Sequence, residues 1–188
     1  KTQGVSLSPD LESGMEGTCA GSGACAACCL AEHGQYVGAH HQRVRIAKTL
    51  YLALFPDDFI DQLANELGSH QRKAASEGVN AAARLNVLSD VTWERVPELM
   101  EVFQERGHEI KLYDYTKLPW SVRQPRPDAY HLTYSLGERQ GSLNRAFDWM
   151  NKGSNAAVVV GPALTVEQKA QIDRYNVQLR MILAIGGS

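Results

Sequence analysis

The chain has 188 residues, of which 44% are hydrophobic and 21% are charged, and these values exclude wholesale disorder. The formal net charge of −2, from 19 basic and 21 acidic residues, argues against a dedicated nucleic-acid-binding protein, whose domain is usually basic. No apolar run approaches the roughly 18 residues of a membrane span and no secretory signal is visible, so we expect an intracellular protein without membrane association.

The expected elements divide the chain into two parts of a single domain. Residues 1–41 are rich in Gly, Ser and Ala and contain one expected strand, at 4–8. Helices are expected over 41–55 and 57–67, on either side of Pro56, because apolar residues recur there at a helical spacing. From residue 83 the sequence alternates, with expected strands at 83–90, 109–115, 129–135, 155–161 and 181–187 and expected helices at 93–107, 142–153 and 165–179. This alternation predicts an α/β fold with parallel strands over 42–188.

Polar residues occupy alternate positions in three of these strands, whereas strands of a parallel sheet covered on both faces are almost continuously apolar. If the apolar faces meet the helices, the polar faces line a shared concavity. The pattern predicts a partial, open TIM-like βα barrel of about six mostly parallel strands with a wet lumen; an antiparallel sheet with one solvated face is the alternative. The candidate catalytic residues, expected to orient a substrate in this lumen, are Arg84, Asn86, Lys111, Tyr113 and His131.

The segment YDYTK places Asp114, Tyr115 and Lys117 at the end of an expected strand. Barrel enzymes keep active groups at this position. A charged strand end without function is the alternative.

All four cysteines, Cys19, Cys25, Cys28 and Cys29, fall within eleven positions of a Gly- and Ala-rich loop. Core packing does not suit such a loop, and disulfides are rare inside cells. A zinc site needs further ligands, for which His33, His40 and His41 are candidates. Clustered thiolates among small residues also fit a [4Fe–4S] cluster, in which a set of three ligands leaves one iron open. We therefore expect an N-terminal metal-binding loop, with an iron–sulfur cluster favoured over zinc.

A cysteine loop placed directly after the first strand of a six-stranded partial barrel resembles the radical S-adenosylmethionine enzymes. The spacing here is C-x5-C-x2-C or C-x5-C-x3-C, not the usual C-x3-C-x2-C, and LSD replaces the glycine-rich GGE element after the second strand. The resemblance implies that the open iron binds S-adenosylmethionine and that a radical derived from it abstracts hydrogen from the substrate. Cofactor contacts are then expected from Asp90, Ser135 and Glu138.

Five segments, CLAEHGQY, ARLNVLSDVTWE, KLYDYTK, YHLTYSLGE and GSNAAVVV, resemble the family of actinobacteriophage proteins named after mycobacteriophage gene 88. The resemblance implies a phage origin, and hence the cytoplasm of the infected host cell, without specifying chemistry. The family's last cysteine precedes an x-A-x-x-G-x-Y tail, which implies Cys19, Cys25 and Cys29 as ligands. Cys28 is then an extra thiol or a fourth ligand.

Two function hypotheses follow. The first is a phage iron–sulfur enzyme of radical S-adenosylmethionine type, acting on a small-molecule or single-residue substrate. The second is a metal-stabilised protein, with a closed cluster or zinc, that binds a host factor or nucleic acid. The role of Cys28 separates the two, because four thiolate ligands leave no iron free for a cofactor. The sequence specifies neither the substrate nor the oligomeric state.

Overall fold

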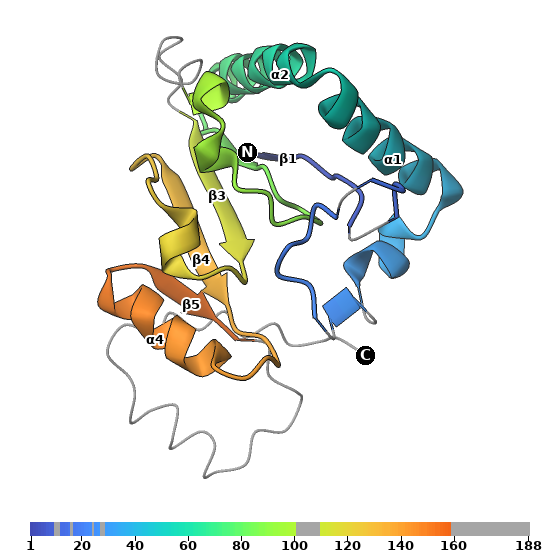
Figure 1. Cartoon of the computed structure of the whole chain (residues 1–188). Coiled ribbons are helices and arrows are strands. Elements are labelled where there is room, and N and C mark those ends of the chain that lie inside the picture. The colour runs from blue at the N-terminus through green and yellow to red at the C-terminus, as the bar shows by residue number, and fades with distance from the viewer. Residues whose placement is uncertain (10–11, 16, 24, 27–28, 101–109, 159–188) are drawn as a thin grey trace.

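In the described part of the chain, five parallel strands form one sheet whose order follows the sequence, β1-β2-β3-β4-β5 (Figure 1). The computed structural model describes residues 1–9, 12–15, 17–23, 25–26, 29–100 and 110–158. The strands are β1 (Thr2–Gly4), β2 (Ala82–Arg84), β3 (Lys111–Thr116), β4 (Tyr130–Ser135) and β5 (Asn155–Ala157). Every neighbouring pair is parallel, so the antiparallel alternative is wrong. The predicted helix over 165–179 and strand over 181–187 lie outside the described residues.

Three α-helices that the structure describes from end to end accompany the sheet: α1 (Ala39–Leu54), α2 (Pro56–Ser76) and α4 (Ser142–Asn151). Pro56 occupies the first turn of α2 with Asp57 and Asp58, where a missing N–H is tolerated and negative charge is favoured. The predicted helix over 93–107 begins as a 3-10 turn, Trp93–Arg95, and continues as helical backbone over 97–100, where the described part ends. No described helix is long and apolar enough to cross a membrane.

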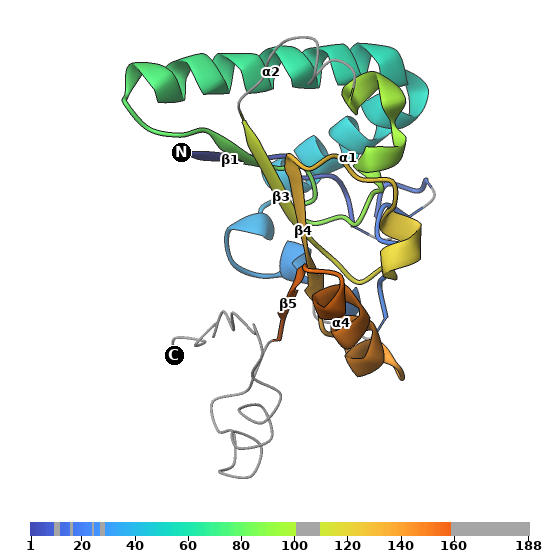
Figure 2. The same cartoon turned by 90° about the vertical axis from the view of Figure 1, so that its left-hand side faces the viewer.

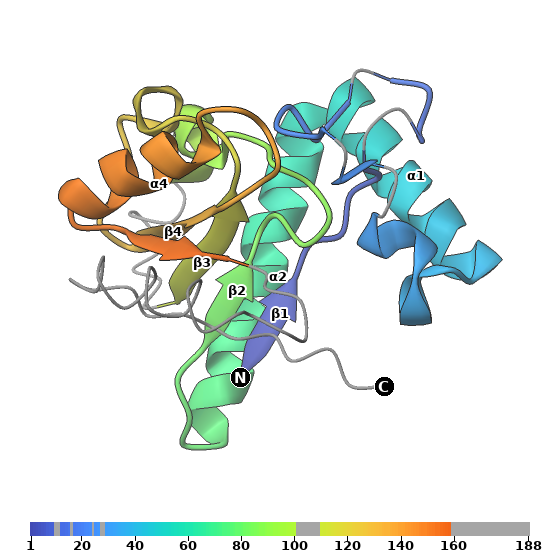
Figure 3. The same cartoon turned by 90° about the horizontal axis from the view of Figure 1, so that it is seen from below.

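One face of the sheet meets the helices. Alternate strand residues, including Leu112, Leu132 and Tyr134, are buried and join a single apolar cluster with side chains of α2 and α4. Figure 3 shows the strands side by side in chain order, with α4 beside β4 and β5, and Figure 2 shows α2 running across the other end of the sheet. The alternation predicted for residues 109–115 and 129–135 is thus confirmed in its phase.

The opposite face carries the polar residues, and no described helix covers it. The register aligns Ala82 with Lys111 and Tyr113 with His131, so Arg84, Tyr113, Tyr115, His131 and Ser135 share this face. These side chains are partly or fully exposed. We refer to this surface as the polar face of the sheet.

Two strands begin earlier and are shorter than predicted, and side-chain hydrogen bonds explain where they end. Beyond Arg84, the Asp114 carboxylate accepts the backbone N–H groups of Leu85 (3.0 Å) and Asn86 (2.9 Å), so the chain leaves the β2–β3 ladder there. The segment after β1 keeps two backbone bonds to the β2 region and then turns to α1, where the Ser8 N–H donates to Thr49 Oγ1. The predicted strand at 83–90 is therefore a three-residue strand followed by an ordered loop.

Candidate functional site

The cysteine loop, residues 17–29 apart from 24, 27 and 28, runs across the carboxyl ends of three consecutive strands. The Asp90 N–H donates to the Thr18 carbonyl at 2.8 Å, and the Cys19 thiol donates to the Leu88 carbonyl at 3.6 Å, which attaches the loop to the segment after β2. A guanidinium N–H of Arg139, from the segment after β4, donates to the Ser22 carbonyl. The loop is therefore fixed at both sides of the strand-end region.

Close packing against the segments after β3 and β4 distinguishes Gly21 and Gly23 of the loop. A Cβ on Gly21 would lie 2.8 Å from Lys117 Cβ and 3.1 Å from Asp90 Oδ2, directly beyond the end of β3. A Cβ on Gly23 would lie 2.4 Å from a carboxylate oxygen of Glu138. A side chain at Gly21 would push the loop away from the end of β3, so glycine is what allows it to pack there, whereas the exposed side chains of Glu138 and Arg139 could move aside for a Cβ on Gly23.

The three described cysteines, Cys19, Cys25 and Cys29, form no disulfide, and each is half-buried. All three line two adjoining cavities, one of about 490 Å³ toward α1 and one of about 430 Å³ toward the strand ends. Within the part of the chain that the structure describes, no three His, Cys, Asp or Glu side chains are grouped closely enough to hold a metal ion. Cys28 lies outside the described residues.

The histidines considered as zinc ligands do not join the thiols. His33, His40 and His41 are exposed. The described lining of the two thiol cavities includes none of them. Nothing in the described residues therefore assembles a mixed cysteine–histidine zinc site.

A buried ion pair closes the α1 side of the first cavity. Arg45 is buried and contacts both carboxylate oxygens of Glu12, at 2.6 and 3.3 Å, while its third nitrogen donates to the Tyr36 carbonyl. Burial raises the pKa of Glu12, but the hydrogen bond and charge of Arg45 outweigh it and hold that pKa below its ordinary value. Sequence reasoning missed this pair, because its partners are 33 positions apart and only the fold brings them together.

The second cavity, which we call the strand-end cavity, lies between the cysteine loop and the polar face of the sheet. Its described lining includes the three thiols together with Arg84, Asp90, Tyr115, Lys117 and Ser135. Four residues that the sequence predicted for catalysis or cofactor binding therefore line the same cavity as the cysteines: Arg84, Asn86, Asp90 and Ser135. Lys111, Tyr113 and His131 share the same sheet face but belong to the earlier parts of β3 and β4 and are not among the lining residues.

Asn86 borders the strand-end cavity, but its side chain forms hydrogen bonds within the protein that stabilise the fold. It is buried, and Oδ1 accepts from Ser89 Oγ, the Val91 N–H and Trp93 Nε1 at 2.8 to 3.0 Å. Its Nδ2 donates to the Val91 carbonyl and to the Tyr130 hydroxyl. The predicted role in a wet lumen does not fit these contacts, because every polar atom of the amide already has a protein partner.

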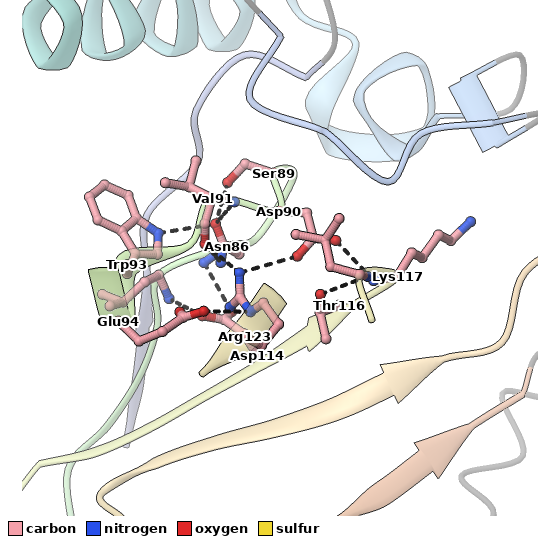
Figure 4. Close-up of polar contacts among 12 residues, drawn as sticks. Asn86, Ser89, Asp90, Val91, Trp93, Glu94, Asp114, Thr116, Lys117 and Arg123 are labelled. Atoms are coloured by element: carbon pink, nitrogen blue, oxygen red, sulfur yellow. Dashed lines mark hydrogen bonds and ion pairs between the residues drawn. The ribbon is translucent and has the colours of Figure 1, made fainter. Parts of the chain in front are cut away.

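A buried charged cluster orders the loop that follows β2 (Figure 4). The Arg123 guanidinium lies 3.0 Å from Glu94 and 3.6 Å from Asp90, and it donates to the Val91 carbonyl. Burial raises the pKa values of Asp90 and Glu94, while the charge of Arg123 acts in the opposite direction. Asp90 also accepts the Lys117 N–H at 2.9 Å. These contacts position Asp90 as an anchor of the loop, while its Oδ1 has no hydrogen-bond partner among the described residues.

Glu138, the third predicted cofactor contact, lies on the exposed rim. Its carboxylate is 3.8 Å from the Lys117 ammonium and faces Gly23 of the cysteine loop. The segment YDYTK, by contrast, contributes directly, since Tyr115 and Lys117 line the strand-end cavity and Asp114 holds the end of β2.

Asp114 is the most perturbed carboxyl group of the region. Burial raises its pKa to about 6, against the hydrogen bonds from Tyr130 and from the Asn86 and Leu85 N–H groups and the charge of Arg84. The Tyr130 hydroxyl donates to Asp114 at 2.8 Å. Asp114 is thus a buried acceptor at the junction of β2, β3 and β4.

A family model described as "Gene product 88" matches residues 1–181 of the chain. No curated protein and no solved structure matches it.

Proposed function

Because the chain belongs to the phage gene product 88 family, whose description names no reaction, we propose a function from its site. The protein is an iron–sulfur protein in which the cysteine loop holds a [4Fe–4S] cluster. It acts on a small substrate in the strand-end cavity, in the manner of radical S-adenosylmethionine enzymes. The observation that carries the proposal is the placement of three thiols of one loop, none of them in a disulfide, around shared cavities at the carboxyl ends of parallel strands.

The sheet topology supports the architecture that this proposal requires. Strands in chain order, with α2 and α4 packed on one face and a polar opposite face, correspond to a section of a singly wound βα barrel. In such barrels active groups gather at the carboxyl ends of the strands. We infer that the sheet belongs to an open barrel with the polar face toward its lumen.

The donor set suits an iron–sulfur cluster by its chemistry, since thiolates are the ligands that such clusters use. As described, the thiols are not grouped closely enough to hold a metal ion, so binding requires the loop to draw them together. Cys19, Cys25 and Cys29 would be the ligands, and Cys28 is the fourth thiol of the same loop. When bound, such a cluster supplies one-electron reduction of S-adenosylmethionine.

The residues of this chain have the following roles. Ser135 and Glu138 contact the cofactor, and Arg84 with Lys117 orients the substrate at the cavity wall. Asp90 holds the loop backbone. Tyr113, Lys111 and His131 extend the polar face farther from the thiols.

Anaerobic purification followed by iron, acid-labile sulfide and zinc analysis tests the proposal. We expect iron and sulfide in equal amounts and visible charge-transfer absorption in the wild-type protein. Single Cys19→Ser, Cys25→Ser and Cys29→Ser variants should lose the iron, whereas Cys28→Ser should keep it. Ser22→Ala, in the same loop, is the matched control and should also keep it.

Each alternative result contradicts a specific part of the proposed function. Zinc without sulfide, or no metal at all, overturns the cluster. Loss of iron in Cys28→Ser as well indicates a closed four-thiolate site and overturns the enzymatic part, leaving a metal-stabilised binding protein. If the cluster is present, its electron paramagnetic resonance spectrum should change on addition of S-adenosylmethionine, and an unchanged spectrum argues against radical chemistry.

A further inference from the structure

The charges that line the strand-end cavity are unbalanced. Its described lining contains two cationic side chains, Arg84 and Lys117, and one carboxylate, Asp90. The Asp90 Oδ2 accepts the Lys117 N–H, and Oδ1 lies 3.6 Å from the Arg123 guanidinium without a hydrogen-bond partner among the described residues. Cationic side chains therefore outnumber carboxylates in this lining.

Arg84 is arranged as a recognition residue. Its guanidinium carbon lies 5.2 Å from the ring centroid of Tyr115 and 6.0 Å from that of Tyr113, which holds the planar group against aromatic surface. Its Nη2 donates to the Asn86 carbonyl, and its Nε is buried without a hydrogen-bond partner among the described residues. Of the five N–H donors of a guanidinium, one on Nη2 is used and the one on Nε is buried, so the three others, on Nη1 and Nη2, remain for a ligand.

The acidic neighbours of both cations are too distant to use those donors. Arg84 Nε is 3.8 Å from Asp114 Oδ1, and Lys117 Nζ is 3.8 Å from Glu138 Oε2, both beyond hydrogen-bond length. These carboxylates hold the cations in place by charge without occupying their N–H groups. The side chains of Arg84 and Lys117 are 28% and 26% exposed, so both can be reached from the cavity.

From these observations we propose that the strand-end cavity binds a small oxyanion ligand, a carboxylate or phosphate compound, through the guanidinium of Arg84 and the ammonium of Lys117. A volume of about 430 Å³ lies within the range of small-molecule sites. An arginine fork matches the paired oxygens of either anion, and Ser135 adds a neutral donor. The proposal rests on the proposed function in taking this cavity as the substrate site.

Isothermal titration calorimetry with two probes, inorganic pyrophosphate and succinate, at one fixed ionic strength tests the site. We expect one or both to bind the wild-type protein, and whichever binds assigns phosphate or carboxylate as the preferred group. Arg84→Gln should lower the affinity at least tenfold, Lys117→Gln should lower it less, and Arg84→Lys should restore only part of it. Arg72→Gln, which removes one exposed charge from α2, is the matched control and should not change the affinity.

No binding of either probe to the wild-type protein, or binding that survives Arg84→Gln, overturns the proposal. Far-UV circular dichroism and thermal unfolding of each variant establish that a loss of affinity does not come from unfolding. Iron and sulfide content, measured on the same samples, separates the two proposals. Probe binding without iron leaves the oxyanion site standing and removes the cluster, whereas iron without probe binding does the reverse.

Discussion

Asp114 shows how much of this molecule depends on single buried polar side chains. Its carboxylate accepts two backbone N–H groups from the segment after β2 and the hydroxyl of Tyr130 from β4, so one residue of β3 joins three strands. The same burial that makes these bonds strong opposes ionisation and raises the pKa of Asp114 to about 6. The strand junction is therefore sensitive to pH.

The free energy of unfolding should therefore depend on pH. The pKa of Asp114 rises from 3.8 to about 6 on folding, so the folded state binds more protons between these values and stability falls as the pH rises through this window. Two pKa units correspond to about 3 kcal/mol. Asp114→Asn should remove this component, as measured by urea unfolding at several pH values across the window.

Tyr130→Phe provides the companion test. Loss of the hydroxyl that stabilises the carboxylate should raise the pKa of Asp114 further and move the window to higher pH. A pH dependence that is the same in the wild-type protein and in Asp114→Asn would contradict the assignment.

For single residues, the sequence predicted which side chains lie on the polar face better than it predicted what each side chain does. Alternation correctly put Tyr113 and His131 on the polar face, because side-chain direction in a strand follows from position alone. It also put Asn86 there, but β2 ends at Arg84 and the Asn86 amide turns into a buried hydrogen-bond network. No local sequence pattern predicts such a network, because its partners come from segments that are distant in sequence.

At the scale of elements, the cysteine loop depends on close packing against several separate segments. It has no regular secondary structure over residues 17–23, and contacts with Leu88, Asp90, Lys117 and Arg139 hold it in place. Its small residues were recognisable in the sequence as a loop suited to close approach. The surfaces that it approaches were not, because they come from three different strand ends.

Gly21→Ala should loosen this loop. The added Cβ would meet Lys117 Cβ at 2.8 Å, a contact that requires backbone movement and costs about 1–3 kcal/mol. We expect the cysteines of the metal-free protein to react faster with a thiol reagent than in the wild-type protein. Gly38→Ala is the control, since its Cβ would lie 3.4 Å from His41, and equal thiol reactivity in wild type and Gly21→Ala would disprove tight docking of the loop.

For the whole molecule, the fold class followed from the sequence more completely than the site did. Helix and strand periodicity predicted the parallel α/β sheet and the helices α1, α2 and α4, because these signals are local and repeat along each element. The lengths of β1 and β2 did not follow, since tertiary hydrogen bonds determine where they end.

A single apolar cluster joins α2, the sheet and α4, so the described part of the chain should unfold as one unit. Leu67→Ala, at a position 2% exposed in this cluster, should lower the free energy of unfolding by about 3 kcal/mol. Circular dichroism and tryptophan fluorescence should report the same shifted midpoint. Leu54→Ala, at a position 62% exposed, should change it by less than about 0.5 kcal/mol, and separated transitions would contradict a common core.

The path of the cysteine loop has a mechanical consequence. Its anchors follow β2, β3 and β4, and neighbouring strands are about 4.8 Å apart, so the sheet sets the span that the segment from Thr18 to Gly23 must bridge. Deleting one residue between Cys19 and Cys25 would shorten the loop by about 3.5 Å, while the strands that hold its contacts keep their spacing. The five-residue interval between Cys19 and Cys25 therefore determines how far along the loop the second thiol lies from the first.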